Sequence, residues 1–261
     1  MRARIAFGRF LIRLGNFMKS LAVVVMRPDD LVEFNREEYA SPKSVESWSV
    51  KGLVDSGLDQ DEATLLEKLP LREGRLLLLG VGGGREAISL AQMGFDVTAV
   101  DFVPEMVERA SENAAQQGVK IEGLVQEISR LDVPAGSYDV GWLFAAMYSS
   151  IPTRRRRVEM LRRITMALRP GGYFLCQFLY KTRGNFSRQK SLARKAIAFV
   201  TLGNLWYEEG DMLWSNAEFI HAFPSEKELR SEFEAVGFEI VHIHIPEAEG
   251  FTRGRAVLKK S

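Results

Sequence analysis

Short, continuously apolar runs alternate with amphipathic stretches from Gly74 to the end of the chain. Runs of this length that are apolar along most of their residues are typical of parallel strands covered on both faces. They lie at residues 76–79, 95–100, 121–125, 140–144, 173–179, 238–245 and 255–258. The pattern predicts an α/β fold: a doubly wound, mostly parallel seven-stranded sheet with helices on both faces.

Four helices are predicted between these strands, at residues 85–93, 104–117, 153–168 and 225–236. Their ends carry recognisable signals. Pro104 stands in the first turn of the second helix, where its missing N–H costs nothing. Ser225, with Glu228 three residues later, matches a capping box, and Gly237 ends the same helix. The basic run that opens the third helix, residues 154–157, is predicted to be a solvated face.

Two segments depart from this alternation. Residues 1–69 are helical in pattern and are predicted to form an amphipathic helix followed by a helical cap. Residues 70–261 are predicted to form the main domain. Within it, residues 181–223 follow the fifth strand as an insertion, basic in its first half and aromatic in its second. Insertions between late strands lie over the carboxyl edge of a parallel sheet, so this one is predicted to be a lid over a site there.

The first 27 residues contain six basic side chains and no acidic one. On a helical projection one face collects Phe7, Leu11, Leu14, Phe17, Met18 and Leu21, with Arg2, Arg9 and Arg13 opposite. The continuous apolar run, residues 21–26, is far shorter than the ~20 residues that a membrane-spanning helix needs. We therefore expect this helix either to lie on an anionic membrane surface or to dock on the protein's own core or on a partner subunit, as in a homo-oligomer.

Composition narrows the class of protein further. The chain has 261 residues, 46% of them apolar and 26% charged, and a formal net charge of +1. Near-neutrality gives no strong sign of nucleic-acid binding. The single cysteine, Cys176, excludes a disulfide framework, and with only three histidines no metal site is predicted. We expect a cytoplasmic protein, or one attached to a membrane surface through residues 1–27.

A glycine-rich turn follows the first predicted strand. From Leu76 the chain reads LLLLGVGGGR. Glycines let the backbone turn sharply and let a ligand approach without a Cβ in the way, and the helix that follows offers its N-terminal N–H groups. Asp101 ends the next strand, 19 residues beyond Gly82. A parallel sheet places its carboxylate beside the turn, where it can accept both hydroxyls of a ribose, so a nucleoside site is predicted.

The details of the turn separate the ligand classes. A dinucleotide fingerprint requires glycine where Arg85 stands, which disfavours a nicotinamide-dependent oxidoreductase. The pattern Gly80-x-Gly82-x-Gly84 instead resembles the first motif of class I, Rossmann-like S-adenosylmethionine-dependent methyltransferases. Residues 94–106, 137–140, 168–172 and 234–238 resemble later motifs of that family, in the same order. One departure is Leu78, where family members often have an acidic residue.

The resemblance implies S-adenosylmethionine as cofactor and S-adenosylhomocysteine as product. Asp101 would hold the ribose, and Phe102 would lie against the adenine. Glu127 would accept from the adenine N6 amino group, with Ile128 beside the ring.

The resemblance also implies which residues surround the methionine half and the transferred methyl. They are Gly80, Val81, Gly82, Gly84, Phe144 and Ala145. Tyr148 follows in the loop that closes over the methyl group in methyltransferases of this architecture, and His221 is flanked by aromatic residues of the insertion. Both are catalytic candidates, His221 as a substrate contact or general base. Tyr39 and Trp48 are candidates for closing over the cofactor.

These observations predict an enzyme that passes a sulfonium methyl to an oxygen or nitrogen of a small-molecule acceptor by in-line displacement. Two alternatives keep the chemistry and change the acceptor. The stretch 154–195, whose sole acid is Glu159, favours RNA or protein, and residues 1–27 favour a membrane-associated lipid. A nicotinamide-dependent oxidoreductase and a non-catalytic binding protein are the remaining alternatives.

Overall fold

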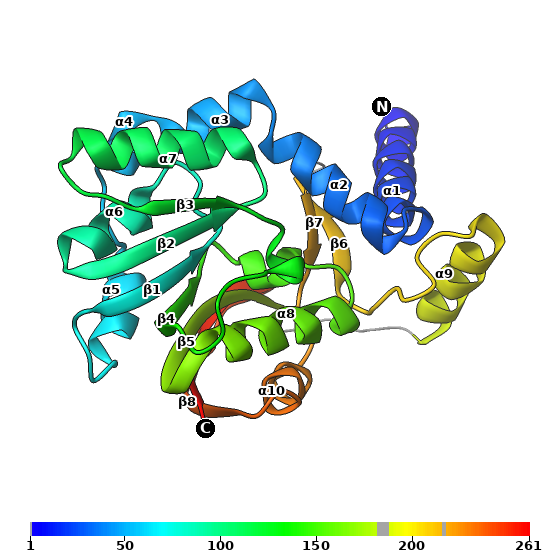
Figure 1. Ribbon diagram of the computed structural model, residues 1–261. Coiled ribbons are helices and arrows are strands. Elements are labelled where there is room, and N and C mark those ends of the chain that lie inside the picture. The colour runs from blue at the N-terminus through cyan, green and yellow to red at the C-terminus, as the bar shows by residue number, and fades with distance from the viewer. Residues whose placement is uncertain (1, 182–187, 216–217) are drawn as a thin grey trace.

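The structure is a computed structural model that describes residues 2–181, 188–215 and 218–261. Its centre is a seven-stranded sheet in the order β3-β2-β1-β4-β5-β9-β8 (Figure 1). The strands are β1 (Gly74–Leu79), β2 (Phe95–Asp101), β3 (Glu122–Val125), β4 (Tyr138–Leu143), β5 (Leu168–Lys181), β8 (Phe238–His244) and β9 (Phe251–Lys260). The first five pair in parallel, and β9 runs antiparallel to β5 and β8. The predicted doubly wound, mostly parallel sheet is confirmed.

The continuous apolar strands are explained by cover on both faces. Alternate side chains of a strand point to opposite faces. In β1, Leu76 and Leu78 enter a core shared with α5 (Gln60–Glu67), α6 (Arg85–Gln92) and α7 (Pro104–Gln116). Leu77 and Leu79 enter a second core, shared with α8 (Arg154–Ala167) and α10 (Glu226–Glu234). All four leucines are fully buried, so a polar residue on either face would be unsatisfied.

The four helices predicted beside the sheet form within two residues of the expected ends. The Ser225 cap is present, because its hydroxyl accepts from the backbone N–H of Glu228 at 3.3 Å. The face that opens α8 differs from the prediction of a solvated run. Arg157 is completely buried, and its guanidinium lies 2.7 Å from Glu232 and 2.7 Å from Glu208. Carboxylates supplied by distant segments make that burial tolerable.

The N-terminal region forms α1 (Arg2–Val25), α2 (Pro28–Tyr39), α3 (Pro42–Ser49), α4 (Lys51–Val54) and α5. Among the described residues, none of the helices combines the length and apolar content of a membrane span. Near the end of α1, Val23 and Val24 are buried in the protein and Leu21 is half-buried, whereas the large apolar side chains from Ile5 to Met18 are exposed. Docking of the apolar face on the protein's own core, one of the two expectations for this helix, is therefore not what the structure shows.

The insertion contains α9 (Arg188–Thr201) and a hairpin of β6 (Asp211–Trp214) and β7 (Glu218–His221). Figure 1 shows the hairpin beside α2 and α9 near α1. Asn35 joins α2 to the hairpin, because its side chain accepts from the N–H of Phe219 at 2.6 Å and donates to the carbonyl of the same residue at 3.3 Å. The N-terminal helices and the insertion therefore pack on each other.

Candidate functional site

A cavity of about 440 Å³ opens at the carboxyl edge of the sheet. Its lining follows the strand order, from Asp101 on β2 through Gly80 after β1 and Ala145 after β4 to Gln177 on β5 and Arg253 on β9. The N-terminal region adds Tyr39 and Trp48, and the hairpin adds Glu218. A cavity of this volume at the carboxyl edge of a mostly parallel sheet is within the usual size range of small-molecule and cofactor sites.

Asp101 is fixed beside the glycine turn by backbone hydrogen bonds. The N–H of Gly82 donates to its Oδ2 at 3.1 Å, and the N–H of Val103 donates to its Oδ1 at 3.0 Å. Burial raises the pKa of Asp101, and hydrogen bonds from the backbone of Val103 and Gly82, and from Phe102 and Val81, oppose that rise. The carboxylate lines the cavity beside the glycine turn, which is where an acid that binds ribose hydroxyls stands in a nucleotide-binding α/β fold.

The turn is ordered without an acid at Leu78, which is buried in the core. The N–H groups of Gly80 and Val81 both donate to the carbonyl of Val100, at 2.7 and 3.1 Å. The side chain of Asn113 on α7 donates to the carbonyl of Gly83 at 2.9 Å. The Val100 carbonyl of β2 and the Asn113 side chain of α7 therefore hold the glycine turn in place, although the acidic residue that family members often have at the position of Leu78 is missing.

Two glycines of the turn are required by close contacts. A Cβ on Gly83 would lie 2.1 Å from the carbonyl oxygen of Trp48, so α3 rests directly on the turn. Gly84 has φ of +99° and a Cβ there would lie 3.1 Å from Ala110 of α7. Gly84 therefore serves helix packing, and it does not line the cavity.

Arg85 occupies the place of a third fingerprint glycine as part of a structural ion pair. Its guanidinium lies 2.6 Å from Glu62 of α5 and 2.7 Å from Glu86, and it donates to the carbonyl of Gly57 at 2.7 Å. Burial raises the pKa of Glu86 to about 7, although Arg85 lowers it. Glu62, Arg85 and Glu86 form the wall of the cavity at the start of α6.

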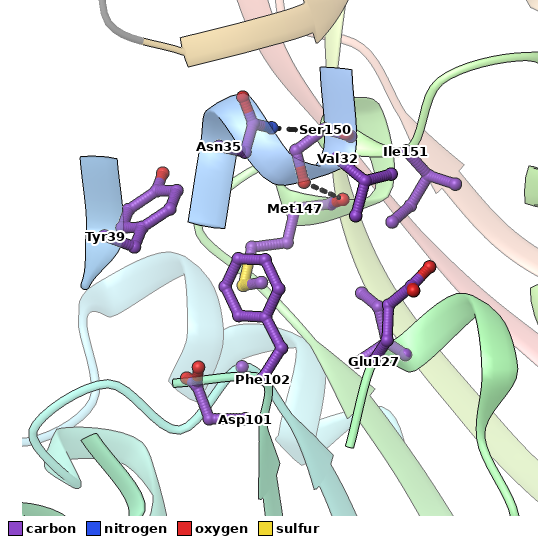
Figure 2. Close-up of a pocket in the computed structure, with 11 residues that line it drawn as sticks. Val32, Asn35, Tyr39, Asp101, Phe102, Glu127, Met147, Ser150 and Ile151 are labelled. Carbon is purple, nitrogen blue, oxygen red and sulfur yellow. Dashed lines mark hydrogen bonds between the residues drawn. The ribbon is translucent and has the colours of Figure 1, made fainter. Parts of the chain in front are cut away.

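A small hollow of about 40 Å³ adjoins the main cavity and shares Gly80, Asp101, Phe102, Tyr39 and Met147 with it. Figure 2 shows the Phe102 ring at its centre, with Tyr39 and Glu127 on opposite sides. Ile128 and Glu127 also line the hollow. The Glu127 carboxylate accepts from Ser129 and lies 3.5 Å from Arg130 and 3.7 Å from Arg156. An aromatic ring and an acidic side chain are groups that can contact a purine and its exocyclic amine, but at about 40 Å³ the hollow admits a purine only if these side chains move.

The structure brings most of the predicted cofactor residues together. Gly80, Val81, Gly82, Asp101, Phe102 and Ala145 line the cavity, and Glu127 and Ile128 line the hollow. Tyr39 and Trp48 line the cavity too. Phe144 does not reach either space, because its ring stacks on Trp142 with centroids 4.3 Å apart in the core.

The two predicted catalytic residues lie away from the cavity. Tyr148, in the short helix η2 (Met147–Ser150), is fully buried and donates to Glu232 at 2.6 Å. His221 is fully buried, and its Nδ1 lies 2.8 Å from Asp211. Burial lowers the pKa of His221, but the hydrogen bond to Asp211 and the Glu228 carboxylate, 3.5 Å from Nε2, outweigh burial and raise it. Both side chains serve the interior of the fold in this structure.

Glu208, Asp211 and His221 gather three atoms of metal-ligand type within the described part of the chain. The Glu208 oxygen that faces His221 at 3.8 Å is also the one that lies 2.7 Å from Arg157. A positive charge is already held there, so the cluster reads as a buried polar network.

The cavity residues that escaped the sequence reasoning include Met147, Gln177, Glu218 and Arg253. Met147 lies against Gly80, where an added Cβ would meet its sulfur at 2.1 Å. Glu218 hydrogen-bonds with the Tyr39 hydroxyl, and burial raises the pKa of both groups. The signal for Glu218 was the strand alternation of β7, which puts it on the face opposite His221.

With this geometry in place, comparison with known proteins is decisive. Residues 76–172, which run from β1 past the glycine turn to the start of β5, match the sequence model of a family described as "Methyltransferase domain". Over these residues the chain is similar to methyltransferase domains, and the sheet around them has the class I, Rossmann-like fold. The motif residues Gly80, Asp101 and Glu127 all fall inside the match.

Curated relatives of this domain include ubiquinone biosynthesis O-methyltransferases. The protein from Xanthomonas euvesicatoria pv. vesicatoria is 31% identical over 121 residues, which are 46% of this chain and 49% of the relative. The protein from Xanthomonas axonopodis pv. citri is 32% identical over 114 residues, 43% of this chain and 46% of the relative. The chain thus spans about half the length of the curated relatives that it matches.

Solved structures share the methyltransferase fold over more of the chain. An S-adenosylmethionine-dependent methyltransferase from Methanosarcina mazei is 23% identical, with a TM-score of 0.61 over 78% of this chain and 98% of its own. A 1,6-didemethyltoxoflavin-N1-methyltransferase from Burkholderia thailandensis, solved with its substrate and S-adenosylhomocysteine, is 18% identical, with a TM-score of 0.60 over 90% of both chains. At these identities the likeness shows the fold.

Proposed function

We propose that the protein transfers a methyl group from S-adenosylmethionine to an oxygen or nitrogen of a small-molecule acceptor. The observation that carries the proposal is the Asp101 carboxylate held against the glycine turn by Gly82, at one end of a cavity that continues to β9. The relatives support both acceptor atoms, because their names specify O-methylation in one case and N1-methylation in another.

The residues present fit the cofactor. Asp101 would hold the ribose hydroxyls, Phe102 and Ile128 would bracket the adenine, and the turn at Gly80 and Gly82 would follow the methionine half. Bound there, S-adenosylmethionine supplies a methyl carbon already activated by a sulfonium. The chain then needs to align an acceptor with that carbon and exclude water, which is what Tyr39, Trp48 and the hairpin do by covering the cavity.

The acceptor half would lie at β4, β5 and β9, beyond the turn. An oxygen or nitrogen acceptor must lose a proton as it is methylated. Glu218 is the carboxylate of this half that is suited to take it, because burial raises its pKa toward the working range of a base. The Tyr39 hydroxyl, whose own pKa is raised by burial, stays protonated and orients that carboxylate. Gln177 and Arg253 provide further polar contacts.

The division of the chain follows from this arrangement. We treat residues 70–261 as the methyltransferase domain, residues 1–69 as its helical cap, and residues 181–223 as a lid that carries part of the acceptor pocket. Tyr39 and Trp48 from the cap and Glu218 from the lid support this division, since each lines the cavity.

Calorimetric titration with S-adenosylhomocysteine tests the nucleoside half. Asp101→Asn is expected to lose about 1.5–3 kcal/mol of binding free energy, because the amide replaces one charged acceptor by a donor. Asp96→Asn is the matched control, since Asp96 is exposed at the other end of the same strand. Wild-type affinity is expected to fall as the solution is acidified through the raised pKa of Asp101, starting above the usual value of 3.8.

Absence of binding by the wild-type protein would refute the proposal. Equal affinity of wild type and Asp101→Asn would show that the ligand sits elsewhere.

A membrane-associated acceptor is the second candidate, favoured by one observation. The large apolar side chains of α1 from Ile5 to Met18 are exposed, Phe7 and Met18 by 62% and 63%. A contact of residues 1–27 with a bilayer would bring the cavity to an apolar acceptor that is dissolved there.

A further inference from the structure

An apolar row runs along α1, and all of its members except the half-buried Leu21 are exposed. It consists of Phe7, Leu11, Leu14, Met18, Leu21 and Val25, spaced alternately by four and three residues, so that they lie on one side of the helix. Phe10 and Phe17 widen the row. We call these residues the α1 stripe.

The stripe points away from the protein. Where α1 meets the body, Val23 and Val24 are buried, whereas Val25, the last member of the stripe, is 46% exposed. The buried and exposed side chains belong to the same turn of helix, so the stripe is on the side that the fold leaves uncovered. A monomer rarely leaves so long an apolar row in water.

The insertion adds a second apolar group beside the end of α1. Phe199, Val200, Leu202, Leu205 and Trp206 come from the end of α9 and the turn after it, and each is exposed. The turn is fixed to α1, because Asn204 donates from its backbone to the carbonyl of Val24 at 2.8 Å and from its side chain to that of Val23 at 3.2 Å. The two apolar groups therefore form one surface with a fixed orientation.

The charge of this surface is predominantly positive. The sequence of α1 contains five basic residues and that of α9 four, and neither helix contains an acid, although the whole chain is almost neutral. A groove of about 690 Å³ borders the turn and is lined by Leu202, Leu205 and Trp206 together with five arginines. Asp29 and Glu159 are the acids of its lining. Arg155 of this groove makes no ion pair within the described part of the chain.

We propose that α1, α9 and the turn at residues 202–206 together bind an anionic phospholipid bilayer, with the arginine groove receiving the phosphates of the headgroups. The inference rests on the membrane contact proposed above for residues 1–27 and extends it to the insertion that carries the lid. Apolar side chains enter the boundary between headgroups and acyl chains, and the surrounding bases are attracted to the lipid charge.

Charge decides between this occupant and the others. A second copy of the chain would bring two predominantly basic surfaces together, which is repulsive. RNA would satisfy the arginines but would leave the α1 stripe in water. An anionic bilayer is the partner that satisfies both halves of the surface.

Sedimentation with sucrose-loaded vesicles, of phosphatidylcholine alone or mixed with phosphatidylglycerol, tests the proposal on the full chain. Leu14→Gln/Met18→Gln changes the stripe, Phe199→Gln/Val200→Gln changes α9, and Arg155→Gln changes the groove. Met93→Gln/Met166→Gln and Arg109→Gln are matched controls, since these exposed side chains belong to the sheet-covering helices or their ends. Every variant is also titrated with S-adenosylhomocysteine.

Wild type is expected to bind the anionic vesicles and to bind phosphatidylcholine weakly. Each apolar pair should weaken binding at least about tenfold and Arg155→Gln about fivefold, with the controls near wild type and nucleoside binding unchanged. If only Leu14→Gln/Met18→Gln weakened vesicle binding, the roles proposed for α9 and for the arginine groove would be overturned. No vesicle binding, a dimer in sedimentation equilibrium that the same pairs abolish, or arginine-dependent RNA binding in place of vesicle binding would overturn the whole inference.

Failure of nucleoside binding with vesicle binding intact would refute the proposed activity and leave this surface standing.

Discussion

Met147 and Tyr148 are neighbours in one short helix, yet only Met147 reaches the cavity. The sequence predicted that this loop covers the site, and the loop does so with a different side chain. Tyr148 turns inward because Glu232 accepts from its hydroxyl and Phe223 stacks on its ring, with centroids 5.6 Å apart. Both partners lie more than 70 residues further along the chain, so no local pattern could show them.

Glu218 is the residue at which the proposed chemistry is most easily challenged. Glu218→Gln is expected to lower kcat by about 100-fold or more, because the amide cannot accept the acceptor's proton. It should leave affinity for S-adenosylhomocysteine unchanged. Release of S-adenosylhomocysteine would be measured with the best acceptor from a panel of phenols and aromatic amines, and Glu239→Gln on exposed β8 is the control.

The pH profile separates a base from a mere contact. Because burial raises the pKa of Glu218, wild-type activity should fall as pH falls through a value above 4.5, and the variant should lack that limb. Full activity of Glu218→Gln with the pH dependence of the wild type would show that Glu218 is not the base.

At the scale of elements, burial on both faces made the sheet predictable. Interior parallel strands must be apolar throughout, and glycine, proline and serine mark where their helices start and stop. The site was predictable as far as it depends on β1, β2 and β3, which carry the glycine turn, Asp101 and Glu127. The direction of His221 was not, because it depends on how a hairpin inserted after β5 pairs and packs.

The contact between α8 and α10 shows a second limit of sequence reasoning. Four consecutive arginines predict a solvent-exposed helix face. The carboxylate of Glu232 on α10, however, accepts hydrogen bonds from Arg157 and allows its burial. Each carboxylate oxygen of Glu232 accepts from that guanidinium, and one also accepts from Tyr148. The Arg157–Glu232 ion pair joins α8 to α10 on the same face of the sheet.

Removal of this carboxylate is expected to destabilise the fold strongly. Glu232→Ala should lower the free energy of unfolding by about 3–5 kcal/mol, since it leaves a buried guanidinium short of its partner. Glu234→Ala, two residues further on the same helix and exposed, should change it by less than about 0.5 kcal/mol. Urea denaturation of both variants measures the difference, and similar values for the two would show that the pair contributes nothing net.

At the scale of the whole molecule, the cavity is built from three parts of the chain. Its floor is the carboxyl edge of the sheet, and the N-terminal helices and the insertion add side chains that line it from the other side. The same two segments present the exposed apolar and basic surface on their outer side. Under the two proposals above, the same unit would admit the acceptor and attach the protein to a membrane surface.

A crystal structure of the protein with S-adenosylhomocysteine tests the central claim most directly. The account predicts ribose hydroxyls on the two oxygens of Asp101, adenine between Phe102 and Ile128, and Met147 moved off Gly80 to admit the ligand. Density for the ligand with its ribose away from Asp101, or a cleft that stays closed at saturating ligand, would contradict it.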